Sequence, residues 1–384
     1  MGKREMPTRD KLVSYDYAVA GHAGTMCDPD GHFFIKPCTQ AEVDFYQSAT
    51  RRHPEFAEIM PLYMGTLQLE DPEHIQLDDS VTGLVTEDGA LQAAKEELVH
   101  MVQEQVSAAA AAAVAQNGDA SQSENLPVPA AWVPTRGKKI KTDKSVVLEN
   151  ASGAFKRPNI LDVKLGVRLW ADDAPQEKKT RFDKISRETT HANLGFRIAG
   201  MRVFRGSESN AELDDEEYMI YDKDYGRLHV NDDNVVQEFR KFIFNSTAGI
   251  DEELGKAVCD AFVRDLERVE AVLSSHETRM FSASLLFVFE GDGRALRNAI
   301  EKNNASVDAL IEEQEQRSAK RVDSGIVMDD DPDSELDLEV ELPAIYKLKL
   351  IDFAHAQWTP GQGPDENILK GVRSLHRIFH EMAS

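Results

Sequence analysis

The 384-residue sequence is poor in cysteine, and this scarcity excludes two classes of small stabilising site. Its three cysteines, Cys27, Cys38 and Cys259, are far apart and form no C-x-x-C pair. A disulfide framework and a cysteine zinc site are therefore not expected, and a reducing compartment fits. The sequence has no run of about 18 apolar residues, so we expect no membrane-spanning helix. The charged N-terminus contains no apolar core, so we expect no signal peptide.

Two common nucleotide-binding motifs are also absent. The sequence contains neither G-x-x-x-x-G-K-[ST] nor G-x-G-x-x-G, so P-loop and Rossmann folds lose support. His376 and His380 have the i, i+4 spacing of a zinc-binding helix but lack the glutamate of H-E-x-x-H. We interpret this pair as part of an amphipathic helix.

Positive charge is in deficit. The formal net charge is −24, so general attraction to nucleic acid or to an anionic membrane is not expected. We therefore predict no direct nucleic-acid partner, and a polyanionic ligand would need a local basic patch.

Two segments have the composition of insertions. The first, at about 87–144, contains an alanine tract and a proline-rich piece, and we expect it to be mainly disordered. The second, at about 318–341, contains "MDDDPDSELDLEVE" and is expected to be mobile and solvated because its like charges repel.

The rest of the chain has ordinary globular patterns. Strands are predicted over residues 31–37, 145–166, 194–204, 282–291 and 345–356, and helices over 176–188, 234–245, 251–275 and 366–382. A helix is also predicted after Thr39, because Thr39-x-x-Glu42 fits a capping box. Interleaved strands and helices indicate a two-lobed α+β enzyme.

One strand carries an acid and a base that a strand does not need. The pattern is Pro158-x-x-x-Asp162-x-Lys164-x-Gly166, within "RPNILDVKLGVRLW". Because strand side chains alternate, Asp162 and Lys164 lie on one side. The same alternation places Ile160 on their side and turns three residues toward the core, namely Leu161, Val163 and Leu165. The pair is thus predicted to project into a cleft.

A group of basic residues follows this strand. On the predicted helix, Lys178, Arg181 and Lys184 are spaced i, i+3, i+6 and share roughly one face. One interpretation is a solvated face neutralised by Glu177 and Asp183. The other is a pocket for a multiply phosphorylated ligand, since lysine and arginine form charge-assisted bonds with phosphate.

Two further positions suggest phosphate chemistry. Asp352 ends an apolar strand, where an aspartate either caps the next turn or holds Mg²⁺ beside nucleotide phosphates. His355, three residues later, either faces the same cleft or is structural. Lys36 ends a strand and precedes Glu42, which is the lysine–glutamate arrangement of kinases, although any strand can end in lysine.

Together these motifs resemble the inositol polyphosphate kinase family. The P-x-x-x-D-x-K-x-G signature is followed by "LGFRIAGMRVF", "SASLLFVFEG" and "KLIDFAHA" in the family's order, and "AGHAG", "FFIKP" and "EVDFY" are similar to its N-lobe. The resemblance implies a two-lobed α+β fold distantly similar to protein kinases, with a small helical substrate-binding segment. It implies an N-lobe over residues 11–168, this segment over 169–190 and a C-lobe over 191–384.

The resemblance also implies a role for each candidate residue. Lys36 would hold ATP phosphates, and the backbone of Glu149 to Ala151 would contact adenine. Asp162 would bind the ribose near the substrate hydroxyl, and Lys164 would stabilise the transferring phosphoryl group. Four side chains would hold substrate phosphates: Lys178, Arg181, Lys184 and His355.

The implied cofactor is Mg²⁺ with ATP as co-substrate. Asp352 would bind the metal, with Ser284 nearby in the ATP site.

Within the family, the short chain and "IDFAHA" are most similar to the multikinase branch, especially fungal forms. That branch phosphorylates inositol tris- and tetrakisphosphates toward the pentakisphosphate. The hexakisphosphate kinase branch is the alternative, and a scaffold in transcription complexes, with or without kinase activity, is another. We expect a monomer in nucleus and cytoplasm. Soluble inositol polyphosphates, phosphoinositide headgroups and transcription-complex proteins are the partners considered.

Overall fold

The computed structural model describes residues 13–15, 19, 24–28, 30–71, 74–77, 142, 144–206, 213–214, 216–324 and 342–384. The insertion expected at about 87–144 falls outside these residues, apart from Thr142 and Lys144. Of the acidic segment expected at about 318–341, residues 318–324 belong to a helix and the rest falls outside. Among the described helices, none combines the length and apolarity needed to cross a bilayer.

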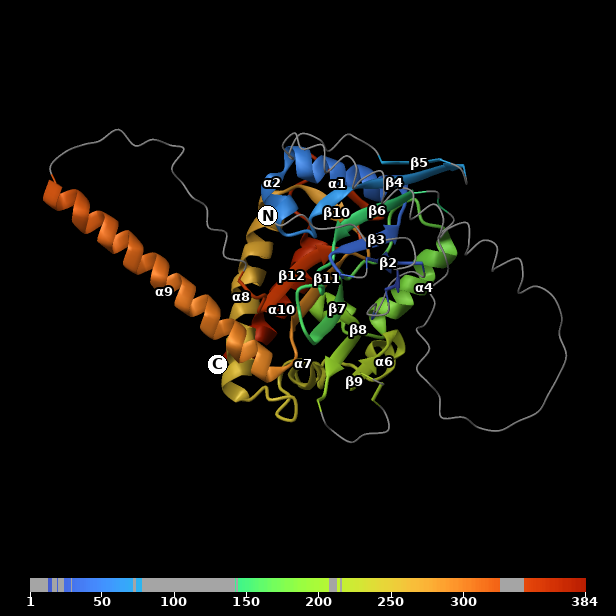
Figure 1. The fold of residues 1–384 in the computed structure, drawn as a ribbon. Helices are drawn as coiled ribbons and strands as arrows, with labels where there is room; N and C mark the ends of the chain where they lie inside the picture. Colours follow the sequence, from blue (N-terminus) through green and yellow to red (C-terminus); the bar gives the residue numbers. More distant parts are fainter. Residues whose placement is uncertain are drawn as a thin grey trace.

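The N-terminal half forms an antiparallel sheet of six strands in the order β1-β2-β3-β6-β4-β5 (Figure 1). The strands are β1 (Val13–Ser14), β2 (Met26–Cys27), β3 (Phe33–Pro37), β4 (Tyr63–Asp71), β5 (His74–Leu77) and β6 (Lys144–Glu149). Helices α1 (Gln40–Arg52) and α2 (Pro54–Glu58) pack on it. Thr39 caps α1 by accepting a hydrogen bond from the Glu42 amide, as its sequence predicts.

The C-terminal half is built on a five-stranded antiparallel sheet in the order β12-β11-β7-β8-β9. These strands are β7 (Pro158–Leu165), β8 (Phe196–Phe204), β9 (Tyr218–Tyr221), β11 (Ser284–Glu290) and β12 (Tyr346–Ile351), and a separate pair joins β10 (Thr278–Met280) to β13 (Ala356–Trp358). The sheets divide in the link 150–157, whereas the expected lobe boundary lies at residue 168. The difference arises because β7 hydrogen-bonds to β11 and β8 and not to any N-terminal strand.

Helices surround this second sheet. They are α4 (Gln176–Arg187), α5 (His191–Leu194), α6 (Lys223–Leu228), α7 (Val235–Ile243), α8 (Glu252–Ser275), α9 (Gly293–Ser324) and α10 (Glu366–Ala383). In α8 the predicted apolar stripe Val258, Phe262, Leu266 and Val269 is buried. α9 starts against β11 and then extends away from the body (Figure 1).

One hydrophobic core runs through both halves. It includes Tyr46 of α1, Leu161 of β7 and Phe379 of α10, each no more than 1% exposed. Phe353, which follows β12, packs edge-on against Tyr46 and face-on against Phe45. The two sheets are thus fixed to each other by packed rings at the end of β12, the strand that leads to Asp352.

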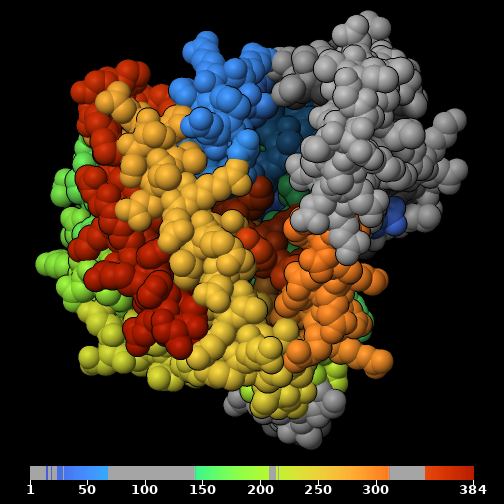
Figure 2. All heavy atoms as spheres, turned by 90° about the vertical axis from the view of Figure 1, so that its left-hand side faces the viewer, coloured from blue at the N-terminus to red at the C-terminus, as the bar shows by residue number. Residues whose placement is uncertain are grey.

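A hollow lies behind the link between the sheets, between α8, the end of α2 and the edge strand β12 (Figure 2). Its walls pair Glu149 with Lys347 and Glu58 with Arg268. The amide of Leu350 donates to the carbonyl of Ile59 across this junction, at 2.8 Å. These contacts tie the edge of the second sheet to the first half.

Two glycines let helix α10 approach the end of β7. Gly195 adopts φ +73°, and its carbonyl oxygen accepts a 2.7 Å hydrogen bond from the amide of Gly166. A methyl group on Gly371 of α10 would collide with that same oxygen. The end of the signature strand is therefore positioned by a backbone contact that tolerates no side chain.

We predict that Gly371→Ala lowers the melting temperature, although alanine is the better helix former by about 1 kcal/mol. Overpacking against a backbone oxygen typically costs about 1–3 kcal/mol. Thermal unfolding followed by circular dichroism measures the change. The matched control is Gly255→Ala in α8, where the nearest neighbours of a methyl group would be side-chain atoms of Phe244 rather than a backbone oxygen. A melting temperature for Gly371→Ala at or above that of the wild type would contradict this packing.

Candidate active site

The signature strand β7 presents its acid and its base to one cleft. Leu161, Val163 and Leu165 have 0% exposure and belong to the main core, so the predicted alternation is confirmed. Ile160 and Asp162 line a cavity on the opposite face, between the two sheets. Lys164 lies two residues after Asp162 in β7 and therefore projects from that same face.

The signature glycine has a specific steric role. Gly166 adopts φ +95°, which favours glycine, and a Cβ at this position would lie 2.6 Å from the amide nitrogen of Asn367. The Asn367 side-chain oxygen accepts hydrogen bonds from the amides of Val167 and Arg168, both at 2.8 Å. The chain leaving β7 is thereby anchored to α10 and directed toward α4.

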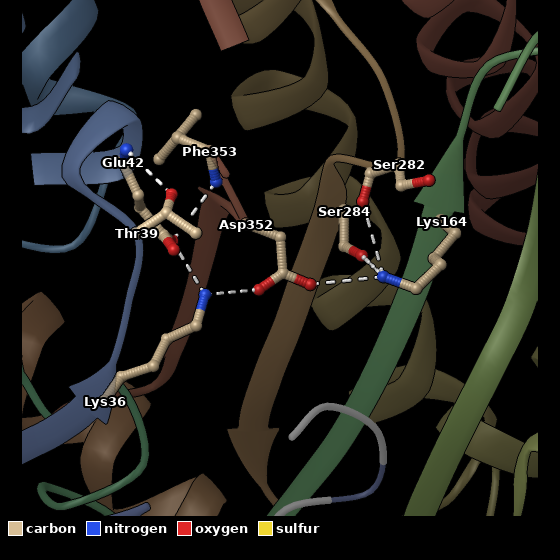
Figure 3. Close-up of polar contacts among 8 residues, drawn as sticks. All are labelled: Lys36, Thr39, Glu42, Lys164, Ser282, Ser284, Asp352 and Phe353. Atoms are coloured by element: carbon tan, nitrogen blue, oxygen red, sulfur yellow. Dashed lines mark hydrogen bonds and ion pairs between the residues drawn. The ribbon is translucent and has the colours of Figure 1, made fainter. Parts of the chain in front are cut away.

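Asp352 connects the two lysines of the cleft (Figure 3). Its Oδ1 accepts from Lys36 Nζ at 2.7 Å, and its Oδ2 accepts from Lys164 Nζ at 3.1 Å. Asp352 adopts φ +70°, a left-handed conformation that costs a residue with a Cβ about 1–2 kcal/mol. Such strain persists only where surrounding contacts hold it, and it concentrates at functional sites.

Lys36 lies at the end of β3 and makes a second ion pair. Its Nζ donates to Glu42 Oε1 at 2.7 Å, and that carboxylate is 1% exposed. Glu42 does not reach back to Thr39 as a capping-box glutamate would. Instead it also accepts from the amide of Phe353 at 3.3 Å, and so joins α1 to the residue after Asp352 (Figure 3).

Lys164 is held from three directions. Its Nζ donates to Ser284 Oγ at 3.1 Å and to the Ser282 carbonyl at 3.4 Å, as well as to Asp352. Ser282 has φ +63°, a second left-handed residue beside the site. Ser284, expected in the ATP site, is fully buried and supports the lysine from behind.

The pKa values of these groups follow from their ion pairs. Burial alone would raise the pKa of Asp352, but Lys36 and Lys164 outweigh it and hold that pKa well below its usual range. Burial would lower the pKa of both lysines, and the facing carboxylates raise it instead. All three groups are therefore charged throughout the neutral pH range.

Asp162 is the least satisfied group of the site. It is 3% exposed, and its Oδ1 has no hydrogen-bond partner among the described residues. Burial is the main cause that raises its pKa, although the charge of Lys164 opposes the shift. A Cβ on Gly200, which pairs with Asp162, would collide with the Val19 carbonyl, so the N-terminal segment crosses β8 beside this carboxylate.

The cavity beside these groups has an apolar part and a charged end. Its apolar walls come from both sheets: Phe34, Leu148, Ile160, Leu286 and Ile351. Lys36, Asp162 and Asp352 form the charged end of the cavity. Glu149, Asn150 and Ala151 form the cavity wall where the chain passes from the first sheet to the second. Such a cavity fits a flat aromatic base with its phosphates directed toward the lysines. The Glu149 side chain is paired with Lys347, and the amides of Glu149 and Asn150 donate to the carbonyls of Leu62 and His32.

The structure separates the predicted basic cluster of α4. Lys178 Nζ lies 3.5 Å from His355 Nε2, in an exposed contact. Arg181 and Lys184 line a different hollow along the helix together with Arg187. Lys184 also lies 3.8 Å from Glu188. Successive residues at a spacing of three shift progressively around a helix. Of the three predicted residues, Lys178 contacts His355, whereas Arg181 and Lys184 face the other hollow.

One charged residue of the site region has no role in the sequence-based prediction. Arg197 of β8 is 8% exposed and lies directly opposite Lys164 in the sheet. The only sequence signal for it is a charge inside the apolar run "LGFRIAG".

A magnesium ion fits this donor set. Mg²⁺ is commonly held by one or two carboxylates together with water and substrate phosphates, and Asp352 supplies a carboxylate at the charged end of the cavity. Within the described ranges, no group of three or more metal-binding side chains gathers at this site or at any other, so the ion would rely on Asp352 together with water and phosphate oxygens. The ion would neutralise phosphate charge there.

The two lobes, the lysine–aspartate–lysine contact and the adjoining cavity define a phosphotransferase of the kinase-like type. Residues 145–380 match the sequence model of the inositol polyphosphate kinase family, and the chain belongs to this family. It is therefore an inositol polyphosphate kinase, and it is similar to the multikinases of this family.

Two fungal relatives match almost end to end. The inositol polyphosphate multikinase of Saccharomyces cerevisiae is 28% identical, over 97% of this chain and 99% of the relative. The multikinase of Schizosaccharomyces pombe is 24% identical, over 96% and 97%. Mouse inositol hexakisphosphate kinase 3 is 27% identical but matches only 63% of this chain and 52% of its own length.

A solved structure is similar in fold. The crystal structure of the S. cerevisiae inositol phosphate multikinase in complex with ADP and Mn²⁺ aligns with 92% of this chain and 100% of its own, with a TM-score of 0.53 and 23% identity. The predicted two-lobed α+β fold is confirmed.

We predict that Asp352→Asn leaves a folded protein with a clearly lower melting temperature. The substitution removes the charge that both buried lysines face, and breaking a buried ion pair typically costs about 3–5 kcal/mol. Thermal unfolding followed by circular dichroism measures the change in melting temperature, and denaturant titration measures the loss of free energy. Asp172→Asn is the control, because Asp172 pairs with Arg168 at the surface, where such pairs contribute about 0–1 kcal/mol. Equal stability of the two variants would contradict the proposed importance of Asp352.

Proposed function

We propose that this kinase transfers the γ-phosphoryl group of ATP to hydroxyls of inositol tris- and tetrakisphosphates, toward the pentakisphosphate. The observation that carries the proposal is the sharing of Asp352 between Lys36 and Lys164 at the charged end of the cavity between the sheets. Phosphoryl transfer depends mainly on positioning and on neutralising phosphate charge, and this arrangement offers both.

In this proposal the nucleotide occupies the cavity between the sheets. Adenine lies against the link at Glu149 and Ala151, and the phosphates extend toward Lys36. Mg²⁺ is held by Asp352 and, when bound, neutralises phosphate charge. The S. cerevisiae multikinase, whose structure contains ADP and Mn²⁺, supports this assignment.

Asp162 and Lys164 act on the reacting groups. Asp162 accepts the proton of the attacking hydroxyl, and burial raises its pKa, which makes it a better proton acceptor. Lys164 stabilises the charge of the phosphoryl group in transfer, with Ser284 orienting its ammonium.

Substrate phosphates lie toward α4. Lys178 and His355 form the nearest pair, and Arg181 and Lys184 extend the basic surface along the helix. An open, mainly helical site of this kind suits more than one inositol phosphate and admits phosphoinositide headgroups as further substrates.

The hexakisphosphate kinase activity is the second candidate, because relatives of that type share about two thirds of this chain. The end-to-end match with two multikinases favours the first. By the same resemblance we propose a location in nucleus and cytoplasm, and a further scaffolding role in transcription complexes.

The test is product analysis by chromatography. Purified protein, ATP and Mg²⁺ are offered separately inositol tris-, tetrakis- and hexakisphosphate, and a phosphoinositide in vesicles. We expect pentakisphosphate from the first two and no consumption of the hexakisphosphate. Consumption of the hexakisphosphate alone would favour the second candidate. If none of the offered substrates is consumed, only the proposed scaffolding role would remain.

Lys164→Ala is expected to lower kcat by about 10²- to 10³-fold, the loss typical when one electrostatic stabiliser of a transition state is removed. The KM for ATP should change little, because Lys36 remains. Lys179→Ala is the matched control, since the Lys179 ammonium donates to the Asp172 carbonyl and lies over the Trp170 ring. Steady-state kinetics of both variants test this prediction. Equal losses in kcat would mean that Lys164 has a structural role and no catalytic one.

A further inference from the structure

Strand β8 carries two buried arginines with different surroundings. Arg202 is 4% exposed, donates to Glu216 at 2.6 Å and to Asp214 at 3.3 Å, and lies 3.9 Å over the Tyr218 ring. Arg197 is 8% exposed and forms no ion pair within the described residues. Its Nη1 donates only to the carbonyls of Ile198 and Lys223, at 3.0 and 3.4 Å. A buried guanidinium without a carboxylate partner is unusual, because burial of an unpaired charge is costly.

The register of the sheet directs Arg197 toward the active-site cleft. Arg197 lies opposite Lys164, and Gly200 lies opposite Asp162, with Ala199 as the extra residue of a bulge between them. Directly opposed residues project from the same face of a sheet. Arg197 of β8 therefore shares one face of the sheet with Lys164 and Asp162 of the signature strand β7.

Two polar atoms on this face have no partner. Within the described part of the chain, Asp162 Oδ1 and Arg197 Nε are both buried and form no hydrogen bond. Buried polar groups normally have a partner, either in the protein or in ordered water. An acceptor on Asp162 and a donor on Arg197, both unsatisfied on one face, are complementary.

The charges around these two residues leave few other partners for Asp162. The ionisable groups contributed by the surrounding elements are Lys164 of β7, Asp352 after β12, His191 of α5, and Asp224 and Arg227 of α6. Burial lowers the pKa of His191 to about 3, so this ring is neutral. Burial lowers the pKa of Arg197 only to about 10, so it keeps its charge. The cations that act on Asp162 are thus Lys164 and Arg197.

Lys164 is not a constant partner for this carboxylate. Its ammonium is directed at Asp352 and Ser284, and in the proposed reaction it turns to the transferring phosphoryl group. Arg197 is fixed by two backbone carbonyls and cannot follow.

We propose that Arg197 is a positioning residue that keeps the Asp162 carboxylate charged and oriented while Lys164 engages the phosphoryl group. Its guanidinium acts on Asp162 through its charge or through a buried water, and it does not touch the substrate. The catalytic part of this inference rests on the proposed function, whereas the pairing of Arg197 with Asp162 does not.

A stability cycle tests the pairing without reference to activity. Arg197→Gln is made in the wild type and in the Asp162→Asn variant, and melting temperatures are measured. We expect a loss of several degrees in the wild type and a smaller loss with Asp162→Asn, because no carboxylate is then left unpaired. Arg202→Gln is the matched control from the same strand, and its loss should be equal in both backgrounds. An equal loss for Arg197→Gln in both backgrounds would overturn the pairing.

Kinetics test the positioning role. Arg197→Gln should lower kcat by about 10- to 100-fold, part of the 10²- to 10⁴-fold that a general base contributes, with KM values unchanged. The acidic limb of the pH–kcat profile should move to higher pH, because the pKa of Asp162 rises when a neighbouring cation is lost. Arg197→Lys should recover part of both effects.

A raised KM for the inositol phosphate with an unchanged kcat would overturn the proposal and make Arg197 a phosphate-binding residue. A wild-type protein without kinase activity would defeat the proposed function alone, since the stability cycle would still decide the pairing.

Discussion

The site depends on one carboxylate that two lysines share. Asp352 joins Lys36, 316 residues earlier in the chain, to Lys164, 188 residues earlier. Both sheets are thereby linked at the point where the cavity ends. The strained backbone at Asp352 and Ser282 is tolerated because the packed rings around Phe353 and the pairing of β11 with β12 hold it. Removing this carboxylate would leave two ammonium groups facing each other in a partly buried site.

The same contact explains how a site of concentrated charge is stable without a ligand. Each lysine already has a carboxylate, so neither is left unpaired in the low-dielectric interior. In the proposed function, nucleotide phosphates would replace that carboxylate as partner, and the freed Asp352 would then hold a metal ion. Asp162 differs because one of its oxygens is unpartnered and buried. It is the group that gains most from an arriving hydroxyl and from a fixed cation such as Arg197.

Local patterns with a strict period were predictable from the sequence. The alternation of β7 and the apolar stripe of α8 depend only on backbone geometry, and the structure has both. The direction of Arg181 and Lys184 depends on how α4 packs, which Ser186 and the Asp183–Trp170 hydrogen bond decide. The boundary between the lobes depends on which strands form hydrogen bonds with β7, and the sequence of β7 alone does not show this. Arg197 was not predictable because a single charge in a strand does not reveal the residue opposite it.

The central claim is that Asp352 restrains both lysines until nucleotide phosphates replace it as their partner and it binds the metal ion. Calorimetric titration of ADP into the wild type and Asp352→Asn, with EDTA and then with Mg²⁺, tests it most directly. Without metal, the account predicts that Asp352→Asn binds ADP at least about tenfold more tightly, a difference of about 1.4 kcal/mol, because the lysines are free and a negative charge is gone. With Mg²⁺ the order should reverse. Weaker binding by Asp352→Asn in both conditions would contradict the account.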